Sequence, residues 1–201
     1  MWASVILDST CVVCRTPGAH LCSTCRSGVA EGERPRLVLD GVPVYALGWY
    51  TGTLRDVIRA AKNFRSRAVL RTVAPEVRNL TASLPPQPAV PIPPSRAGFR
   101  RRGYGLAPMI ARMLGRPVLK VLRLRDAGTQ QGRSAAERTR QRTMTARQPR
   151  VSRVILVDDV LTTGASMRAA IGALSSVNCE VVAIVVLAVV PSRGAPHSIC
   201  T

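Results

Sequence analysis

The sequence predicts an α/β protein, in which helices flank a parallel sheet and a small cysteine-rich module precedes it. Between residues 42 and 190, short apolar runs of strand length alternate with segments of helical periodicity, a pattern typical of parallel sheets. Four cysteines within the first 32 residues form two Cys-x-x-Cys pairs. The chain has 201 residues, enough for one core of moderate size and a small appendage.

The first 32 residues have the cysteine spacing of a metal-binding module. Two residues between the members of each pair let both sulfur atoms reach one metal ion, and two pairs complete a tetrahedral set that suits structural Zn²⁺. An iron–sulfur cluster, disulfides and a redox-active pair are the alternatives. We therefore expect a zinc-binding four-cysteine module over residues 1–32, held folded by its metal, and a second domain over residues 40–201. The predicted ligands are Cys11, Cys14, Cys22 and Cys25.

The charge balance is strongly basic. The net charge is +18, and Lys62 and Lys120 are the only lysines, so almost all of the basic side chains are arginine. Such an excess indicates an anionic partner: the phosphates of a small ligand, nucleic acid, or both. The chain starts without the features of a secretory signal. Its longest apolar run, residues 181–190, is about half of a bilayer span. We therefore expect a cytoplasmic protein with no membrane partner.

The first half of the predicted domain begins with a strand. Residues 42–50 are rich in β-branched and aromatic side chains, which favour a strand. Apolar residues at helical spacing then predict helices over 54–64 and 68–80, with a bend or break of the second at Pro75. Residues 89–92 form a short apolar strand. A loop of high positive charge is expected over 93–105.

The second half continues the alternation. A helix is expected over 106–114, a strand over 117–124 and a polar loop over 126–132. Ser134 and Glu137 form a capping box at the start of a short basic helix over 134–142. Residues 151–157 and 181–190 are apolar strands, and the helix between them covers 166–177.

The most informative segment reads VILVDDVLTTGAS, from Val154 to Ser166. An apolar strand ends at two adjacent carboxylates, and a loop with hydroxyl groups and a glycine leads into a helix. Ligands of parallel sheets bind beyond the carboxyl ends of the strands, and a helix N-terminus attracts phosphate. Neighbouring carboxylates can accept hydrogen bonds from two vicinal hydroxyl groups of a ribose. The segment therefore indicates a sugar-phosphate site, and an ordinary strand–helix turn is the alternative.

This segment resembles the 5-phosphoribosyl-1-pyrophosphate (PRPP) motif of the type I phosphoribosyltransferases. The whole chain resembles the ComF/GntX family, which has that fold and an N-terminal zinc module. The resemblance also includes the four cysteines, Tyr50 before a helix that ends near Lys62, and the segments 90–93, 101–104 and 131–138. It implies a type I phosphoribosyltransferase fold. The PRPP-binding candidates are Lys62, Asp158, Asp159, Val160, Leu161, Thr162, Thr163, Gly164, Ala165 and Ser166.

The resemblance also implies an activity. PRPP would bind with Mg²⁺, and a nitrogenous acceptor would replace its pyrophosphate at C1 of the ribose. Members of the family in competent bacteria take part in DNA uptake, which implies a link to that process. The candidates for catalysis are Asp158, Asp159, Arg101 and Arg102.

A second hypothesis is a non-catalytic module for nucleic acid. Arginines interleaved with aromatic side chains offer phosphate contacts and stacking platforms for single-stranded DNA. A solvated charged face is the alternative interpretation of the arginines. In a third hypothesis, the zinc module recruits a DNA-uptake or recombination protein. The nucleic-acid candidates are Arg96, Phe99, Arg100, Arg101, Arg102 and Tyr104, with further arginines between residues 133 and 153.

Overall fold

The structure is a computed structural model, and it describes residues 9–63, 68–124 and 143–191. The loop predicted over 126–132, the helix predicted over 134–142 and the family-like segment 131–138 lie outside these residues, as do the arginines between 133 and 142.

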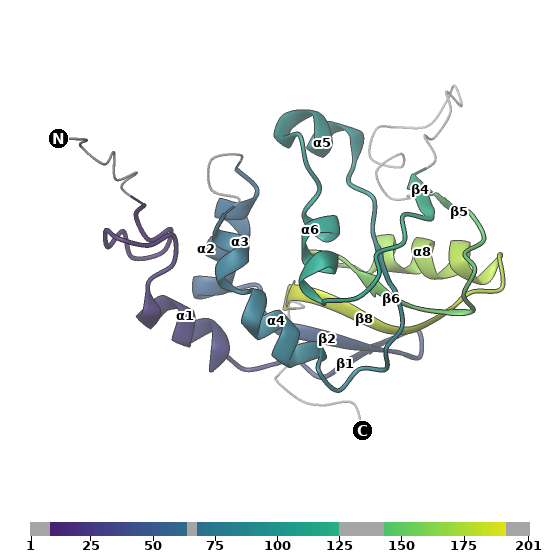
Figure 1. Ribbon diagram of the computed structural model, residues 1–201, viewed down its shortest axis with the longest axis horizontal. Coiled ribbons are helices and arrows are strands. Elements are labelled where there is room, and N and C mark those ends of the chain that lie inside the picture. Colours follow the sequence, from purple (N-terminus) through teal and green to yellow (C-terminus); the bar gives the residue numbers. More distant parts are fainter. Residues whose placement is uncertain (1–8, 64–67, 125–142, 192–201) are drawn as a thin grey trace.

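The core of the molecule is a mixed, mostly parallel sheet (Figure 1). Its strand order is β1-β2-β8-β6-β3, with β7 paired to β8, and only the β1–β2 pair is antiparallel. These strands are β1 (Leu37–Leu39), β2 (Val42–Trp49), β3 (Ala89–Pro91), β6 (Arg153–Val157), β7 (Val160–Leu161) and β8 (Glu180–Val189). A separate antiparallel pair consists of β4 (Leu122–Leu124) and β5 (Met144–Ala146).

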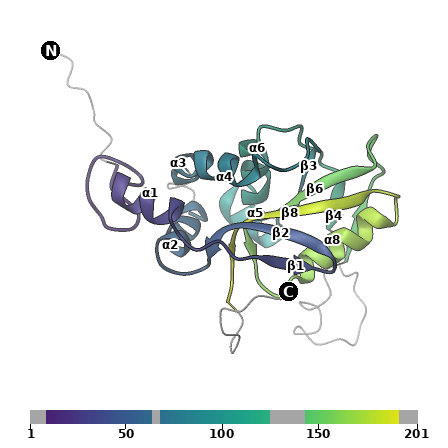
Figure 2. The ribbon, with the colours of Figure 1, turned by 90° about the horizontal axis from the view of Figure 1, so that it is seen from below.

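Helices cover both faces of this sheet. The helices are α1 (Ser23–Ala30), α2 (Gly52–Ala61), α3 (Val69–Thr72), α4 (Ala74–Thr81), α5 (Arg96–Arg102), α6 (Leu106–Met113) and α8 (Ala165–Ser175). Figure 2 shows α3, α4 and α6 on one side and α8 on the other. Successive side chains of β6 point to opposite faces of the sheet. Ile155 and Val157 pack into a core with α2, α3, α4 and α6, whereas Val154 and Leu156 pack with α8. The predicted α/β class, a mostly parallel sheet flanked by helices, is therefore confirmed.

The prediction of a loop over residues 93–105 was wrong, because residues 96–102 form α5. The Ser95 hydroxyl accepts a hydrogen bond of 3.1 Å from the Gly98 N–H and caps the start of this helix. Gly103, with φ of +73°, ends it in the left-handed conformation. The helix has no apolar stripe, so hydrophobic periodicity could not reveal it.

The helix predicted over 68–80 is divided at Val73 into α3 and α4. Pro75 lies in the first turn of α4, where a missing N–H costs no helical hydrogen bond. The strand predicted over 117–124 is shorter, since only 122–124 pairs with β5, and Val118 makes a single bridge to Ala89. No prediction was made for α1, β1, β5 or β7.

The cysteine-rich segment packs against the sheet domain. Cys11, Leu21 and Val29 are buried in the same apolar cluster as Leu47 and Leu54. The segment thus shares a core with β2 and α2. Within the described residues, no helix has the length and apolar character needed to cross a membrane. The apolar run 181–190 belongs to β8.

Candidate functional site

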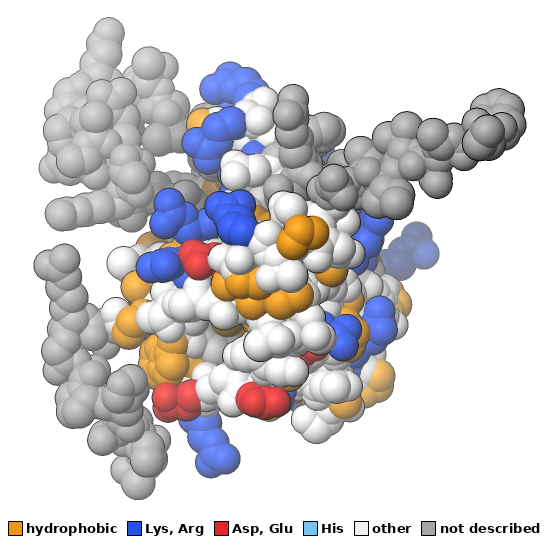
Figure 3. All heavy atoms as spheres, turned by 90° about the vertical axis from the view of Figure 1, so that its left-hand side faces the viewer, with side chains coloured by type: hydrophobic (Ala, Val, Ile, Leu, Met, Phe, Trp, Pro, Cys, Tyr) orange, Lys and Arg blue, Asp and Glu red, His pale blue; other side chains and the backbone are white. Residues whose placement is uncertain are grey.

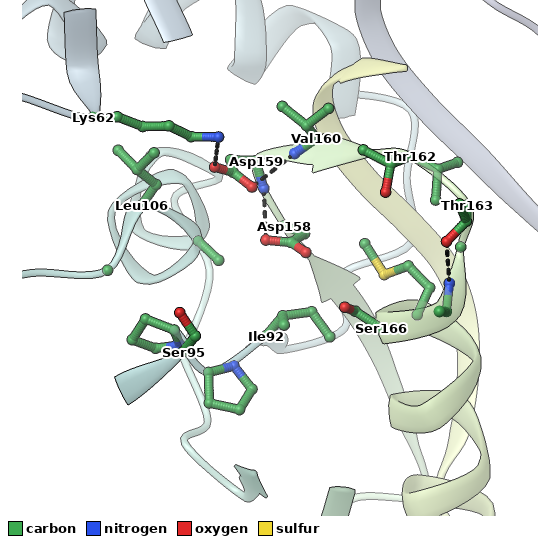
Figure 4. A pocket seen from close by; sticks show the side chains of 18 of the residues that line it. Lys62, Ile92, Ser95, Leu106, Asp158, Asp159, Val160, Thr162, Thr163 and Ser166 are labelled. Atoms are coloured by element: carbon green, nitrogen blue, oxygen red, sulfur yellow. Dashed lines mark hydrogen bonds and ion pairs between the residues drawn. The ribbon is translucent and has the colours of Figure 1, made fainter. Parts of the chain in front are cut away.

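A cavity of about 370 Å³ opens where β3 and β6 end (Figure 4). Its size is within the range of small-molecule pockets. Four chain segments build it: the end of α2, the turn after β3, the junction of α5 and α6, and the connection from β6 to α8. The lining residues are Lys62, Ile92, Pro93, Pro94, Ser95, Arg102, Gly105, Leu106, Ala107 and residues 158–167.

Asp158 and Asp159 lie at the end of β6, half-buried at the wall of this cavity. The Asp158 N–H still donates to the carbonyl oxygen of Val185 on β8, at 3.1 Å, so the sheet fixes the backbone of the pair. Each carboxylate is held by the next peptide group: Asp158 Oδ1 accepts from the Asp159 N–H at 2.8 Å, and Asp159 Oδ1 accepts from the Val160 N–H at 2.9 Å. Neither carboxylate is buried in the core.

Lys62 follows the last residue of α2 and reaches the same wall. Its Nζ atom lies 3.1 Å from Asp159 Oδ2. The lysine side chain is 35% exposed and the aspartate side chain 20%, so the pair is partly shielded from solvent. Figure 4 shows the lysine extending along the edge of the pocket to Asp159, while Asp158 and Ser166 face the open space.

The segment from Thr162 to Ser166 forms a turn and the first two residues of α8. Gly164 adopts φ of +77° there. In the described part of the chain, the N–H groups of Thr162, Thr163 and Gly164 donate no hydrogen bond. Outside the pocket, Arg168 braces the turn: it donates to the Thr163 carbonyl oxygen at 2.8 Å and pairs with Asp40 at 3.2 Å. The turn therefore presents backbone donors and hydroxyl groups at a helix N-terminus, an arrangement that suits an anion.

The arginines of α5 do not share one location. Arg102 lines the cavity, whereas Arg96, Arg100 and Arg101 are exposed and do not. The Arg102 guanidinium lies over Gly98, at a spot where a Cβ atom would come within 2.8 Å of it. Its Nε atom is buried and has no hydrogen-bond partner among the described residues. Of the two arginines predicted for catalysis, only Arg102 lines the cavity that contains the carboxylate pair.

The predicted aromatic platforms are also separated. Phe99 is 49% exposed on α5. Tyr104 is half-buried against the core, and its hydroxyl is directed to the carbonyl oxygens of Ala61 and Asn63 at the end of α2. Tyr104 therefore does not extend the exposed surface around Phe99.

The sequence reasoning missed several pocket residues. Ile92, Pro93 and Pro94 follow β3, whose carboxyl end lies beside that of β6, and Ser95 precedes α5. Their position directly after a predicted strand could have identified them, because neighbouring parallel strands present their carboxyl ends at the same edge of a sheet. Arg168 and Asp40, which brace the turn, carried no such signal.

The four cysteines of the N-terminal segment form a second cluster. Their Sγ atoms all lie within 4.8 Å of one another, and those of Cys14 and Cys22 are 3.6 Å apart. A zinc tetrahedron with bonds of about 2.3 Å has sulfur–sulfur edges of about 3.8 Å, so the cluster has the size that a metal ion requires. All four cysteines carry free thiols. These residues could therefore hold a metal ion.

The thiols of this cluster differ in acidity. Burial raises the pKa of Cys11, but hydrogen bonds from the backbone N–H groups of Cys14, Cys22 and Val13 outweigh it and lower that pKa to about 6. Burial and the neighbouring sulfur atoms raise the pKa of Cys25 to about 12. Crowded sulfur atoms of this kind favour a shared cation, because each thiolate disfavours the next.

The match to a family model confirms the predicted type I phosphoribosyltransferase fold. The model of the phosphoribosyl transferase domain matches residues 97–201, just over half of the chain. Among solved structures, an adenine phosphoribosyltransferase from Leishmania donovani is similar, with a TM-score of 0.40, 16% identity, and coverage of 70% of this chain and 78% of that one. A further adenine phosphoribosyltransferase has a TM-score of 0.40 at 17% identity, covering 81% and 89%.

A purine phosphoribosyltransferase from Pyrococcus horikoshii Ot3 has a TM-score of 0.35 and 19% identity, and covers 66% of this chain and 79% of its own. These identities and TM-scores are too low to transfer a substrate. No curated protein matches the chain.

Proposed function

The chain belongs to the phosphoribosyl transferase domain family, and we propose that it binds PRPP and transfers the phosphoribosyl group to a nitrogenous acceptor, releasing pyrophosphate. One observation carries this proposal. The adjacent carboxylates of Asp158 and Asp159 and the donor-rich turn 162–166 line the same cavity. Acceptors for a diol and donors for a phosphate thus lie on one wall, as a phosphorylated ribose requires.

The contacts suggest how the ligand is oriented. The carboxylates of Asp158 and Asp159 accept hydrogen bonds from the two vicinal ribose hydroxyls. The N–H groups of Thr162, Thr163 and Gly164 and the neighbouring hydroxyls hold the 5′-phosphate. Because both ends of the ribose are then fixed by one rigid strand–turn–helix unit, C1 is directed away from this wall. Orientation of this kind lowers the entropic part of the barrier.

The reaction breaks the bond between C1 and the pyrophosphate oxygen and forms a bond from C1 to the acceptor nitrogen, which gives up one proton to solvent or base. Negative charge grows on the leaving pyrophosphate, so nearby cations stabilise the transition state. Lys62 and Arg102 are the cations that the described pocket supplies. PRPP is expected as its Mg²⁺ complex, in which the ion offsets part of the pyrophosphate charge.

We propose zinc as the ion of the four-cysteine cluster. The support is the donor set, since four sulfur ligands within 4.8 Å of one another and no carboxylate suit structural zinc. We also propose that the chain is a ComF/GntX-type protein with a cytoplasmic role linked to DNA uptake. The support is the combination of the four-cysteine cluster with the pocket in one chain. The division into domains 1–32 and 40–201 remains part of this proposal.

The experiment that tests the PRPP proposal is calorimetric titration with PRPP and Mg²⁺. The doubly substituted protein Asp158→Asn/Asp159→Asn should lose detectable binding while its urea unfolding midpoint stays near that of the wild type. Asp56→Asn is the matched control, because Asp56 is a partly exposed carboxylate on α2 outside the pocket. Equal heats for the wild type and the double variant would contradict the proposal. A screen of nucleobases for pyrophosphate release then identifies the acceptor.

A second candidate function is nucleic-acid binding. The observation in its favour is the exposed surface of α5, where Phe99 lies among Arg96, Arg100 and Arg101. Figure 3 shows basic side chains gathered on the upper part of one face, with few acidic ones among them. Phosphate contacts with a stacking side chain suit single-stranded DNA. Arg100→Ala/Arg101→Ala should weaken such binding and flatten its salt dependence, and an unchanged salt slope would exclude this surface.

A further inference from the structure

We propose that Tyr104 is a positioning residue, which holds Lys62 against Asp159 at the wall of the pocket. The effect on PRPP affinity rests on the proposed function. The contacts that carry the inference do not, and they can be tested without ligand.

The first step concerns the end of α2. The last carbonyl groups of a helix have no partner within it. The hydroxyl of Tyr104 supplies one from a distant part of the chain: it is directed to the carbonyl oxygens of Ala61 and Asn63, the second at 3.1 Å. These two carbonyls belong to the residues on either side of Lys62. The hydroxyl therefore fixes the backbone at the position from which the lysine side chain extends.

The second step concerns Tyr104 itself, which is held firmly. Its ring packs against the core cluster that contains α2 and α6. Gly103 before it ends α5 with φ of +73°. Gly105 after it is buried so closely that a Cβ atom would lie 3.1 Å from Pro94 and from Pro108. A rigid ring on a tightly packed backbone gives the hydroxyl a well-defined place.

The third step is the consequence for Lys62. A lysine has a flexible stem and loses rotamer entropy when it is fixed, so its ion pair depends on the position of the backbone from which the side chain extends. With the backbone held, Nζ lies 3.1 Å from Asp159 Oδ2. Tyr104 also follows Arg102 by two residues. One hydroxyl thus ties together the two segments that carry the pocket cations.

The lysine composition allows a ligand-free test. Lys62 and Lys120 are the only lysines, so an amine-reactive acylating reagent modifies two side chains that mass spectrometry resolves. Lys120 is exposed and outside the pocket, and it serves as an internal reference. Tyr104→Phe removes only the hydroxyl. Its Lys62 should be acylated several-fold faster, relative to Lys120, because the ion pair opens more often.

Tyr45→Phe is the matched control, since Tyr45 lies on β2 and does not line the pocket. It should leave the ratio of the two labelling rates unchanged. A ratio in Tyr104→Phe that equals the wild-type ratio, or falls below it, would overturn the inference.

A double-mutant cycle separates positioning from general stability. Tyr104→Phe should weaken PRPP binding about 3- to 10-fold, the range expected for a lost hydrogen bond. In a Lys62→Met background it should add no further loss, because the side chain through which it acts is gone. The same loss in both backgrounds would refute positioning through Lys62. If the wild type binds no PRPP while the labelling ratio still responds, the proposed function fails and the positioning stands.

Discussion

The Nζ atom of Lys62 lies 3.1 Å from Asp159 Oδ2, so a cation from the end of α2 meets one of the two carboxylates at the end of β6. Two adjacent carboxylates repel a polyanionic ligand. The lysine offsets one of these charges and leaves the oxygens of the pair as hydrogen-bond acceptors. The ion pair therefore makes the proposed diol contacts compatible with a phosphorylated ligand.

We expect Lys62→Met to weaken PRPP binding about 10- to 100-fold, because it removes a charge-assisted contact and exposes the ligand to an uncompensated Asp159. Calorimetric titration measures the change. Lys120→Met is the control, since it removes the only other lysine, which is exposed and outside the pocket. Equal losses in the two variants would mean that net charge, and not this ion pair, governs affinity.

Gly164→Ala should loosen the turn before α8. At φ of +77° an alanine is strained by about 1–2 kcal/mol, and its Cβ would lie 2.9 Å from the Arg168 guanidinium and 3.0 Å from Leu39. Arg168 would have to move, and its hydrogen bond to Thr163 would be lost. We expect a lower free energy of unfolding in urea and weaker binding of PRPP.

Gly172→Ala is the control for this variant. Gly172 lies within α8, and a Cβ atom there meets nothing within 4 Å. Alanine should stabilise this helix by up to about 1 kcal/mol and leave PRPP affinity unchanged. If Gly164→Ala stabilised the protein in the same way, the turn would not need its left-handed conformation.

The sequence predicted the parts of the site that are continuous along the chain. Residues 151–157 and 181–190 are apolar enough to be recognised as strands, and β6 and β8 differ from them by two residues or fewer. The PRPP-like segment follows directly, so its own order brings Asp158 and Thr162 to one edge. The strands β1 and β7 were missed because two or three residues carry no periodicity.

The discontinuous parts could not be predicted in the same way. Residues 100–102 are three consecutive arginines, and a loop gives no reason to distinguish them. The helix distinguishes the three arginines by the side on which each lies. Arg102 lies one turn after Gly98 on the buried side, whereas Arg100 and Arg101 face outward. The contact of Tyr104 with the end of α2 joins positions more than forty residues apart and depends on tertiary packing.

Gly98→Ala should displace Arg102 without unfolding the protein. A Cβ atom at this position would lie 2.8 Å from the guanidinium and 2.9 Å from the Ser95 hydroxyl. The guanidinium and the Ser95 hydroxyl must both shift, which weakens the cap of α5. Alanine favours a helix by up to about 1 kcal/mol, which offsets the loss of a cap of about the same size, so stability should change little. Affinity for PRPP should fall at least about 5-fold, as for a weakened charged contact.

Gly28→Ala tests whether replacing any helical glycine with alanine would lower the affinity for PRPP. Gly28 lies in α1, and a Cβ atom there meets only Thr53 at 3.8 Å, an ordinary contact. Its PRPP affinity should equal that of the wild type. Should Gly98→Ala also bind PRPP with wild-type affinity, the position of Arg102 would be irrelevant to the pocket.

Cys22→Ser should abolish stoichiometric zinc binding, because three thiolates and a hydroxyl replace the four-sulfur set. The cluster lies beside α1, whose Val29 shares a core with Leu47 and Leu54, so loss of the metal should also loosen packing around α2. We expect a free energy of unfolding lower by about 3 kcal/mol or more, at the upper end for single substitutions. Elemental analysis and urea unfolding measure the two effects.

Cys179→Ala is the control: it removes a buried thiol just before β8 and should lower stability while one equivalent of zinc remains. One equivalent of zinc in Cys22→Ser would refute a site built from all four thiolates.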